Sequence, residues 1–191
     1  MVKLKKGLGE TLLRKFYKED SISFNYLYPH SKSVAELALL IAKKNLDKNP
    51  DLDFIYEAAM LHDIGIYMCK ARNIGCYGNY PYIAHGSLGS QLMIKEGYPE
   101  IGLVCERHVG VGISLEDIRK NSLPLPERDM MPVSLEERII CYADKFYSKD
   151  QKNTDKPKSI EKILTKLSKH SPEKPEVFRG FMEEFGYEYI V

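Results

Sequence analysis

The stretch EAAMLHDIGIYMCK, residues 57–70, places a histidine beside an aspartate at the end of an apolar run. Apolar residues recur at helical spacing before this pair, which predicts a buried helix over residues 52–62 that ends before Gly65. A helix in a protein core does not need an imidazole next to a carboxylate. His62 and Asp63 therefore either satisfy the polar end of an ordinary helix or hold a ligand.

Helical periodicity also dominates the rest of the chain. The spacing of apolar residues predicts further helices over residues 8–18, 31–46, 86–96, 100–108, 114–120, 134–148, 158–169 and 175–185. Ser134 and Glu137 stand at the spacing of a capping box. No alternating apolar pattern is long enough to require a β-sheet. The sequence therefore predicts an all-α fold, a bundle of roughly eight helices.

Composition and charge exclude several classes of protein. The chain has 191 residues, 43% of them hydrophobic and 29% charged, which is typical of one soluble globular domain. Its net charge of +1 gives no general attraction for nucleic acid or anionic membranes. The longest apolar run, residues 37–42, is far shorter than the roughly 20 residues that span a bilayer, and the N-terminal lysines precede no signal-like segment. We expect a cytoplasmic protein with no nucleic-acid or membrane partner, whose oligomeric state the sequence does not predict.

The four cysteines are expected to be small core residues, with thiolate ligation by Cys105 and Cys141, each three residues before a candidate ligand, as an alternative. Cys69, Cys76, Cys105 and Cys141 show no CxxC spacing. In a cytoplasmic protein they are expected to be free thiols, mostly small core residues, with a Cys69–Cys76 bridge as the alternative.

Four of the five histidines stand at the predicted ends of helices. His30 precedes one helix, His62 closes the next, His85 opens a third and His108 closes a fourth. Chains turn at helix ends, so side chains from several helices can converge there. His170 lies in a polar C-terminal stretch and is expected at the surface.

Two aspartates accompany these histidines. Asp63 follows His62, and Asp144 lies on or beside the apolar face of the predicted helix 134–148. A buried carboxylate without a partner is costly, so Asp144 requires either a Lys or Arg partner or a metal ion. Four imidazoles and two carboxylates are too many for one tetrahedral zinc site and suit two metals that share a carboxylate. Such a pair clamps phosphoryl groups during transfer to water, and mixed imidazole and carboxylate donors suit iron, manganese or zinc.

These residues resemble a known family. His30, the run His62-Asp63-Ile64-Gly65 and Asp144 in the run YADKF resemble the HD superfamily of metal-dependent phosphohydrolases. His85 and His108 between them resemble its binuclear members, and the chain is most similar to small stand-alone HDIG-type proteins. The resemblance implies an HD-type helical domain over residues 1–191, with its motif core at about 25–150 and a helical extension at about 158–191.

The resemblance also implies roles for the individual residues. The first metal would be held by His30, His62, Asp63 and Asp144. Asp63 would bridge to the second metal, which His85 and His108 complete, and would orient a nucleophilic water between the ions. The cofactors would be two divalent transition-metal ions, iron or manganese, with zinc, nickel or magnesium as alternatives. The reaction would be hydrolysis of a phosphoester or phosphoanhydride in a small phosphorylated molecule, a nucleotide in particular.

Some positions depart from the binuclear cyclic-dinucleotide phosphodiesterases. Ile66 stands where the HD-GYP proteins usually have a lysine, and the Gly-Tyr-Pro at 97–99 falls in a helix break after His85. Both points weigh against a cyclic dinucleotide as substrate. Lys145 and Arg107 are candidate phosphate contacts, with solvated surface charge as an equal alternative for each.

The loop over residues 70–84 is rich in tyrosine. We expect Tyr77, Tyr80 and Tyr82 to pack onto the domain, with the alternative that they cover the metal site and stack on a base.

Three other functional hypotheses stay open from sequence alone. An HD-type di-iron oxygenase has a similar ligand set. A non-catalytic sensor would bind a nucleotide or metal without turnover. Finally, the six residues could be structural polar groups that hold no metal.

Overall fold

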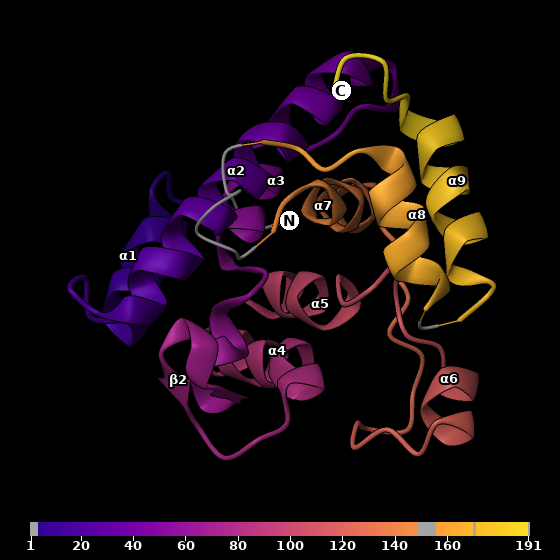
Figure 1. The fold of residues 1–191 in the computed structure, drawn as a ribbon. Helices are drawn as coiled ribbons and strands as arrows, with labels where there is room; N and C mark the ends of the chain where they lie inside the picture. The colour runs from indigo at the N-terminus through magenta and orange to yellow at the C-terminus, as the bar shows by residue number, and fades with distance from the viewer. Residues whose placement is uncertain (1–3, 149–155, 170, 191) are drawn as a thin grey trace.

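A computed structural model describes residues 4–148, 156–169 and 171–190 of the chain (Figure 1). Within them are nine α-helices, four short 3₁₀ helices and one two-stranded sheet. The α-helices are α1 (Leu8–Phe16), α2 (Ile22–Lys44), α3 (Leu52–Leu61), α4 (His85–Lys95), α5 (Pro99–Arg107), α6 (Leu115–Lys120), α7 (Leu135–Phe146), α8 (Ile160–Ser168) and α9 (Lys174–Phe185). The 3₁₀ helices are η1 (Leu46–Lys48), η2 (Ile64–Met68), η3 (Arg72–Ile74) and η4 (Tyr82–Ala84). The predicted all-α fold is confirmed. His170 lies outside the described residues.

The long helix α2 begins nine residues before the predicted start. Ser21 caps it by accepting a hydrogen bond from the Phe24 backbone N–H, and Pro29 lies inside it. Pro29 suggests a helix boundary in sequence, but the turns before it bury Phe24 and Leu27 in the core. This burial outweighs the hydrogen bond that proline cannot donate. The prediction that His30 precedes the helix is therefore wrong, because it lies within α2.

The buried glutamate of α3 holds helix α1 in place. Glu57 is 3% exposed, and its two carboxylate oxygens accept the backbone N–H groups of Gly7 and Gly9, each at 2.7 Å. A carboxylate at a helix N-terminus satisfies N–H groups that have no partner within the helix. The first residue of the stretch 57–70 thus joins α1 to α3.

A small β-hairpin interrupts the helices. Strands β1 (Lys70–Ala71) and β2 (Cys76–Tyr77) pair antiparallel across a turn at Gly75, whose φ is +74°. Two residues per strand are too few for a period-two pattern to be visible in the sequence.

Aromatic packing attaches the C-terminal helices to α7. Tyr142 of α7 lies 5.3 Å from Phe178 and 5.9 Å from Phe185 of α9 between ring centroids, and Phe146 lies 5.9 Å from Phe178. Figure 1 shows α8 and α9 side by side next to α7, in agreement with their contacts. This packing places the C-terminal helices beside the helix that carries Asp144.

The predicted capping box at the start of α7 forms only in part. The Ser134 hydroxyl accepts the Glu137 backbone N–H as predicted. The Glu137 carboxylate does not complete the capping box, because it accepts the Val133 N–H and pairs with Arg107 instead.

The four cysteines are buried and unbridged, as predicted. None of the helices in the described ranges combines the length and the apolar character that crossing a membrane requires.

Candidate metal centre

Five helices bring the six predicted side chains to one place. His30 lies within α2, and Asp144 lies near the end of α7. The other four follow or begin helical segments: His62 is the C-cap of α3, Asp63 comes directly after it, His85 opens α4 and His108 is the C-cap of α5. The helix ends converge as predicted, with His30 as the exception.

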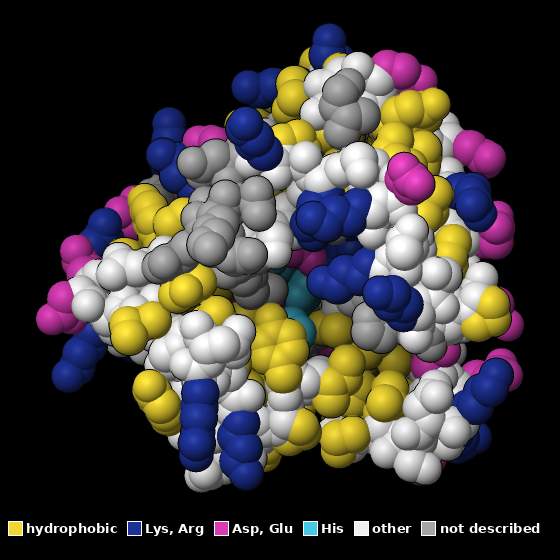
Figure 2. Space-filling view, viewed as in Figure 1, with side chains coloured by type: hydrophobic (Ala, Val, Ile, Leu, Met, Phe, Trp, Pro, Cys, Tyr) yellow, Lys and Arg dark blue, Asp and Glu magenta, His cyan; other side chains and the backbone are white. Residues whose placement is uncertain are grey.

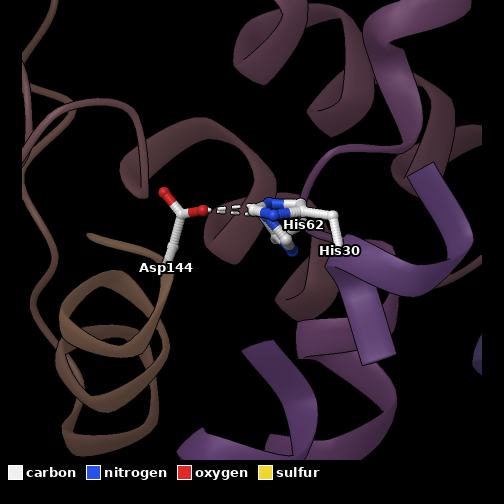
Figure 3. Close-up of side chains that lie close together, drawn as sticks. All are labelled: His30, His62 and Asp144. Atoms are coloured by element: carbon white, nitrogen blue, oxygen red, sulfur yellow. Dashed lines mark hydrogen bonds and ion pairs between the residues drawn. The ribbon is translucent and has the colours of Figure 1, made fainter. Parts of the chain in front are cut away.

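The first group of donor atoms surrounds the Nε2 atoms of His30 and His62, which lie 3.3 Å apart. Oδ1 of Asp144 lies 3.1 Å from Nε2 of His30 and 3.4 Å from Nε2 of His62 (Figure 3). Oδ2 of Asp63 lies 3.3 Å and 3.1 Å from the same two nitrogens. Four side chains from three helices and the turn after α3 thus direct one donor atom each toward a common point.

The second group uses the other oxygen of Asp63. Its Oδ1 lies 3.2 Å from Nε2 of His85 and 3.3 Å from Nε2 of His108. The two imidazole nitrogens lie 3.2 Å from each other. Asp63 therefore faces both groups, with Oδ2 toward the first and Oδ1 toward the second.

Backbone carbonyls fix the orientation of three imidazoles. Nδ1 lies 2.6 Å from the Ala59 carbonyl in His62, 2.7 Å from that of Tyr82 in His85 and 2.7 Å from that of Cys105 in His108. Each carbonyl belongs to the residue three positions earlier, in α3 for His62, in η4 for His85 and in α5 for His108. Because Nδ1 donates to the carbonyl, Nε2 keeps its lone pair for a ligand.

The donor spacing fits a metal ion. Bonds of about 2.0 to 2.2 Å at angles of about 90° to 110° place neighbouring ligand atoms about 2.8 to 3.6 Å apart. Both groups match this spacing. His30, His62 and Asp144, and also His62, Asp63 and His108, form sets whose ligand atoms lie within 4.8 Å of one another. The histidine and aspartate groups could therefore hold metal.

The electrostatics of the cluster favour bound positive charge. Burial lowers the pKa of His62, but the charges of Asp63 and Asp144 raise it more, to about 9. Burial lowers the pKa of His108 to about 4. Burial raises the pKa of Asp144, but Lys145 and the neighbouring imidazoles bring it well below its ordinary value. The carboxylates thus attract a proton to His62, and a metal ion would displace that proton.

Glycine allows the turn after Asp63 to approach α4. A Cβ on Gly65 would overlap the His85 carbonyl oxygen and lie 2.5 Å from the Gly89 nitrogen. The buried Tyr17 hydroxyl secures the same turn by donating to the Ile64 carbonyl and accepting from the Tyr67 N–H. These contacts set the position of Asp63 relative to His85.

The two candidate phosphate contacts lie in different surroundings. Nζ of Lys145 lies 2.7 Å from Oδ2 of Asp144 and donates to the His108 carbonyl at 3.1 Å. Arg107 forms two hydrogen bonds to the Glu137 carboxylate, at 3.0 and 2.9 Å. Lys145 also lines the cavity over the metal-ligand groups, whereas Arg107 is not among its lining residues. The structure brings only Lys145 to the site.

A cavity of about 600 Å³ opens onto the cluster. His30, His85, His108 and Asp144 line it, and apolar side chains such as Ile83, Ile113 and Leu123 line another part. Figure 2 shows histidine side chains in the hollow of this face, with Lys or Arg side chains beside it. The size is that of a small-molecule site.

The tyrosine loop differs from expectation. Tyr77 and Tyr80 are 72% and 52% exposed, so the expected packing of these rings onto the domain is wrong. Backbone hydrogen bonds from Lys70 to the Tyr80 carbonyl and from Gly78 to the Cys69 carbonyl shape the loop. Tyr82 lines the cavity, and its ring centroid lies 4.8 Å from that of His85, which agrees with the alternative of a residue that covers the site.

Four lysines of the cavity were not expected from the sequence. Lys158, Lys166, Lys169 and Lys174 line it from the C-terminal helices and the segments before them. Each stands in a polar, charged stretch, where surface lysines look the same as ligand-binding ones. The sequence does not show that these lysines face the cavity, because their location depends on the packing of α8 and α9 beside α7.

The fold and the site define a helical domain with a cluster of histidines and aspartates that could hold divalent metal. The family model of the HD domain matches residues 27–148, nearly the predicted motif core. The chain belongs to the HD domain family, as the resemblance predicted.

Three relatives show how this domain occurs elsewhere. The chain is 34% identical over 142 residues to an uncharacterized protein of Methanocaldococcus jannaschii, covering 72% of this chain and 76% of that protein. It is 33% identical over 129 residues to a tRNA (cytidine(56)-2′-O)-methyltransferase of Thermoplasma volcanium, covering 67% of this chain and 33% of that protein. The corresponding methyltransferase of Picrophilus torridus is 32% identical over 124 residues, covering 64% and 31%. The chain thus matches about a third of the length of each methyltransferase. No solved structure matches it.

Proposed function

We propose that this protein is a metal-dependent phosphohydrolase that cleaves a phosphoester or phosphoanhydride bond of a nucleotide. One observation carries the proposal. The two carboxylate oxygens of Asp63 face two separate groups of donor atoms. A carboxylate in this position can bridge two ions. Two-metal sites are widely used for displacement at phosphorus.

The donor set supports transition metals, iron or manganese in particular. Neutral imidazoles mixed with carboxylates suit these ions better than magnesium or calcium. When bound, the ions would lower the pKa of a coordinated water and neutralise charge on the phosphoryl oxygens.

The protein's own groups would position the reactants. Asp63 would orient the water, and Lys145 would add a positive charge next to Asp144. In the hydrolysis, the water oxygen bonds to phosphorus, the bond from phosphorus to the leaving oxygen breaks, and the leaving group takes up a proton. The reaction needs no oxidant or reductant.

A small molecule is the substrate that suits the cavity. Its apolar wall offers a surface for a base, and its lysines offer charge for phosphate. The names of the two methyltransferases describe proteins about three times as long as the segment they share with this chain. For this chain we therefore propose a small phosphorylated substrate, and neither methyl transfer as the reaction nor tRNA as the substrate.

Metal analysis and a substrate screen test this function together. We expect about two transition-metal ions per purified chain. Supplemented with Mn²⁺ or Fe²⁺, the protein should release phosphate or nucleotide products from a panel of nucleoside mono-, di- and triphosphates, dinucleoside polyphosphates, cyclic nucleotides and an aryl phosphate.

Three outcomes would contradict the proposal. Bound iron with oxygen consumption and no phosphate release would indicate an oxygenase. Tight nucleotide binding without turnover would indicate a sensor. Protein without stoichiometric metal would indicate structural polar residues.

A further inference from the structure

The C-terminal helices make one margin of the cavity strongly basic. Within the described part of the chain, five lysines line it: Lys145, Lys158, Lys166, Lys169 and Lys174. All but Lys145 lie beyond residue 148, where the match to the family model ends. Four of the five lysines of this basic margin therefore lie outside the matched domain.

Two of these lysines pair with carboxylates in the walls of the cavity, and Lys158 donates to the Lys145 carbonyl at 2.8 Å. Lys145 pairs with Asp144 and donates to the His108 carbonyl. Nζ of Lys174 lies 2.5 Å from the Asp117 carboxylate and donates to the Gly112 carbonyl at 2.8 Å. Their charges are compensated by neighbouring carboxylates.

Lys166 and Lys169 differ from these two. Both are exposed, and neither forms an ion pair with a residue that the structure describes. Ile163 and Leu167 anchor α8, because their side chains are only 3% and 5% exposed. Both residues also line the cavity. Helix α8 and its C-cap residue thus hold two ammonium groups at the cavity margin that have no ion-pair partner among the described residues.

A second phosphate would give these charges a partner. The metal-ligand groups can serve the phosphoryl group that reacts, and the cations at the end of α8 line the same cavity from another element, where they can bind charge on another part of the substrate. Lysine binds phosphate as a point charge on a flexible stem, which suits a chain of phosphates at an open margin.

On the basis of the proposed phosphohydrolase function, we propose that Lys166 and Lys169 are specificity-determining residues that bind a further phosphate of the substrate. The substrate class is then a compound with a chain of two or more phosphates, such as a nucleoside triphosphate, in preference to a nucleoside monophosphate.

Kinetics of a charge-removing variant test the proposal. With one nucleoside as its mono-, di- and triphosphate, the wild-type protein should give the highest kcat/KM for the longer chains. In the Lys166→Ala/Lys169→Ala protein, the ratio of triphosphate to monophosphate kcat/KM should fall about tenfold, mainly through KM. Lys162→Ala is the matched control, because Lys162 is an exposed lysine of α8 that does not line the cavity. An unaltered ratio in the double variant would overturn the proposal.

A binding measurement separates this proposal from the proposed function. Inorganic triphosphate, titrated calorimetrically into each purified protein, should bind about tenfold more weakly to the double variant than to the wild type or the Lys162→Ala control. This difference without any hydrolysis would support the lysine site and contradict the hydrolase. Hydrolysis with equal triphosphate affinity in all three proteins would support the hydrolase and contradict the lysine site.

Discussion

At the residue scale, Asp63 is the side chain on which the candidate centre depends. It is fully buried, and each of its oxygens lies within 3.3 Å of two imidazole nitrogens. A buried carboxylate in this position is stabilised by cations on both sides. His85, in contrast, contributes to one group only.

This difference predicts distinct metal contents for two variants. Asp63→Ala should lose both ions, because both groups lose a ligand and the bridge is removed. His85→Ala should keep about one ion, because the group around His30 and His62 is complete without it. Metal analysis of the folded proteins, checked by circular dichroism, measures this.

The control for these variants is Asp53→Ala, an exposed aspartate of α3. It should retain the wild-type metal content. Equal metal loss in the His85 and Asp63 variants would contradict the separate roles of the two oxygens.

The sequence was informative about these residues for a chemical reason. Imidazoles and carboxylates at helix ends are rare in an apolar core, so their type and spacing indicated a site. The Arg107–Glu137 pair was not visible, because its members lie 30 positions apart and only folding brings them together.

At the element scale, the turn that leaves α3 sets the distance between the two halves of the site. Gly65 brings η2 against the start of α4, and no other residue type leaves space for the His85 carbonyl. The turn therefore couples the position of Asp63 to that of His85.

We predict that Gly65→Ala destabilises the protein and weakens metal binding by the second group. The added Cβ meets backbone atoms, which cannot move as a flexible side chain would, so the cost is about 1 to 3 kcal/mol or more. Thermal unfolding and metal analysis measure the two effects.

Gly180→Ala is a control substitution for which we expect higher rather than lower stability. Nothing lies within 4 Å of a Cβ at this helical position of α9, so the substitution should stabilise the protein by about 0.5 to 1 kcal/mol. A Gly65→Ala protein as stable as this control would contradict the close approach.

At the scale of the whole molecule, the candidate centre joins elements that are far apart in the chain. Its ligands come from α2, the end of α3, α4, the end of α5 and α7. Bound metal would therefore connect most of the core helices, and its removal should affect the stability of the entire fold.

We predict that chelation lowers the melting temperature. One ion at a hundredfold excess over its Kd contributes about 2.7 kcal/mol. For a domain of this size that corresponds to about 5 to 10 °C. Differential scanning calorimetry with and without EDTA measures the change, and added Mn²⁺ should reverse it.

The Asp63→Ala protein serves as the control for chelation. Its melting temperature should not respond to EDTA, because it holds no ion to remove. A wild-type protein with the same insensitivity would indicate that metal contributes nothing to its stability.

The sequence by itself determined the helical class, the family and the six candidate ligands. Helical class follows from periodicity, which is local. The ligands follow from residue chemistry, because charged and imidazole groups enter a core only with partners.

Only the tertiary structure decided how Asp63 divides its oxygens, that α2 continues through Pro29, and that four C-terminal lysines reach the cavity. These features depend on packing between segments separated by many residues. For Phe24, burial outweighed the local signal of proline. For the lysines, the aromatic contacts of Tyr142 with α9 placed a polar segment beside the site. Such contacts have no local signature, because each partner alone resembles an ordinary core or surface residue.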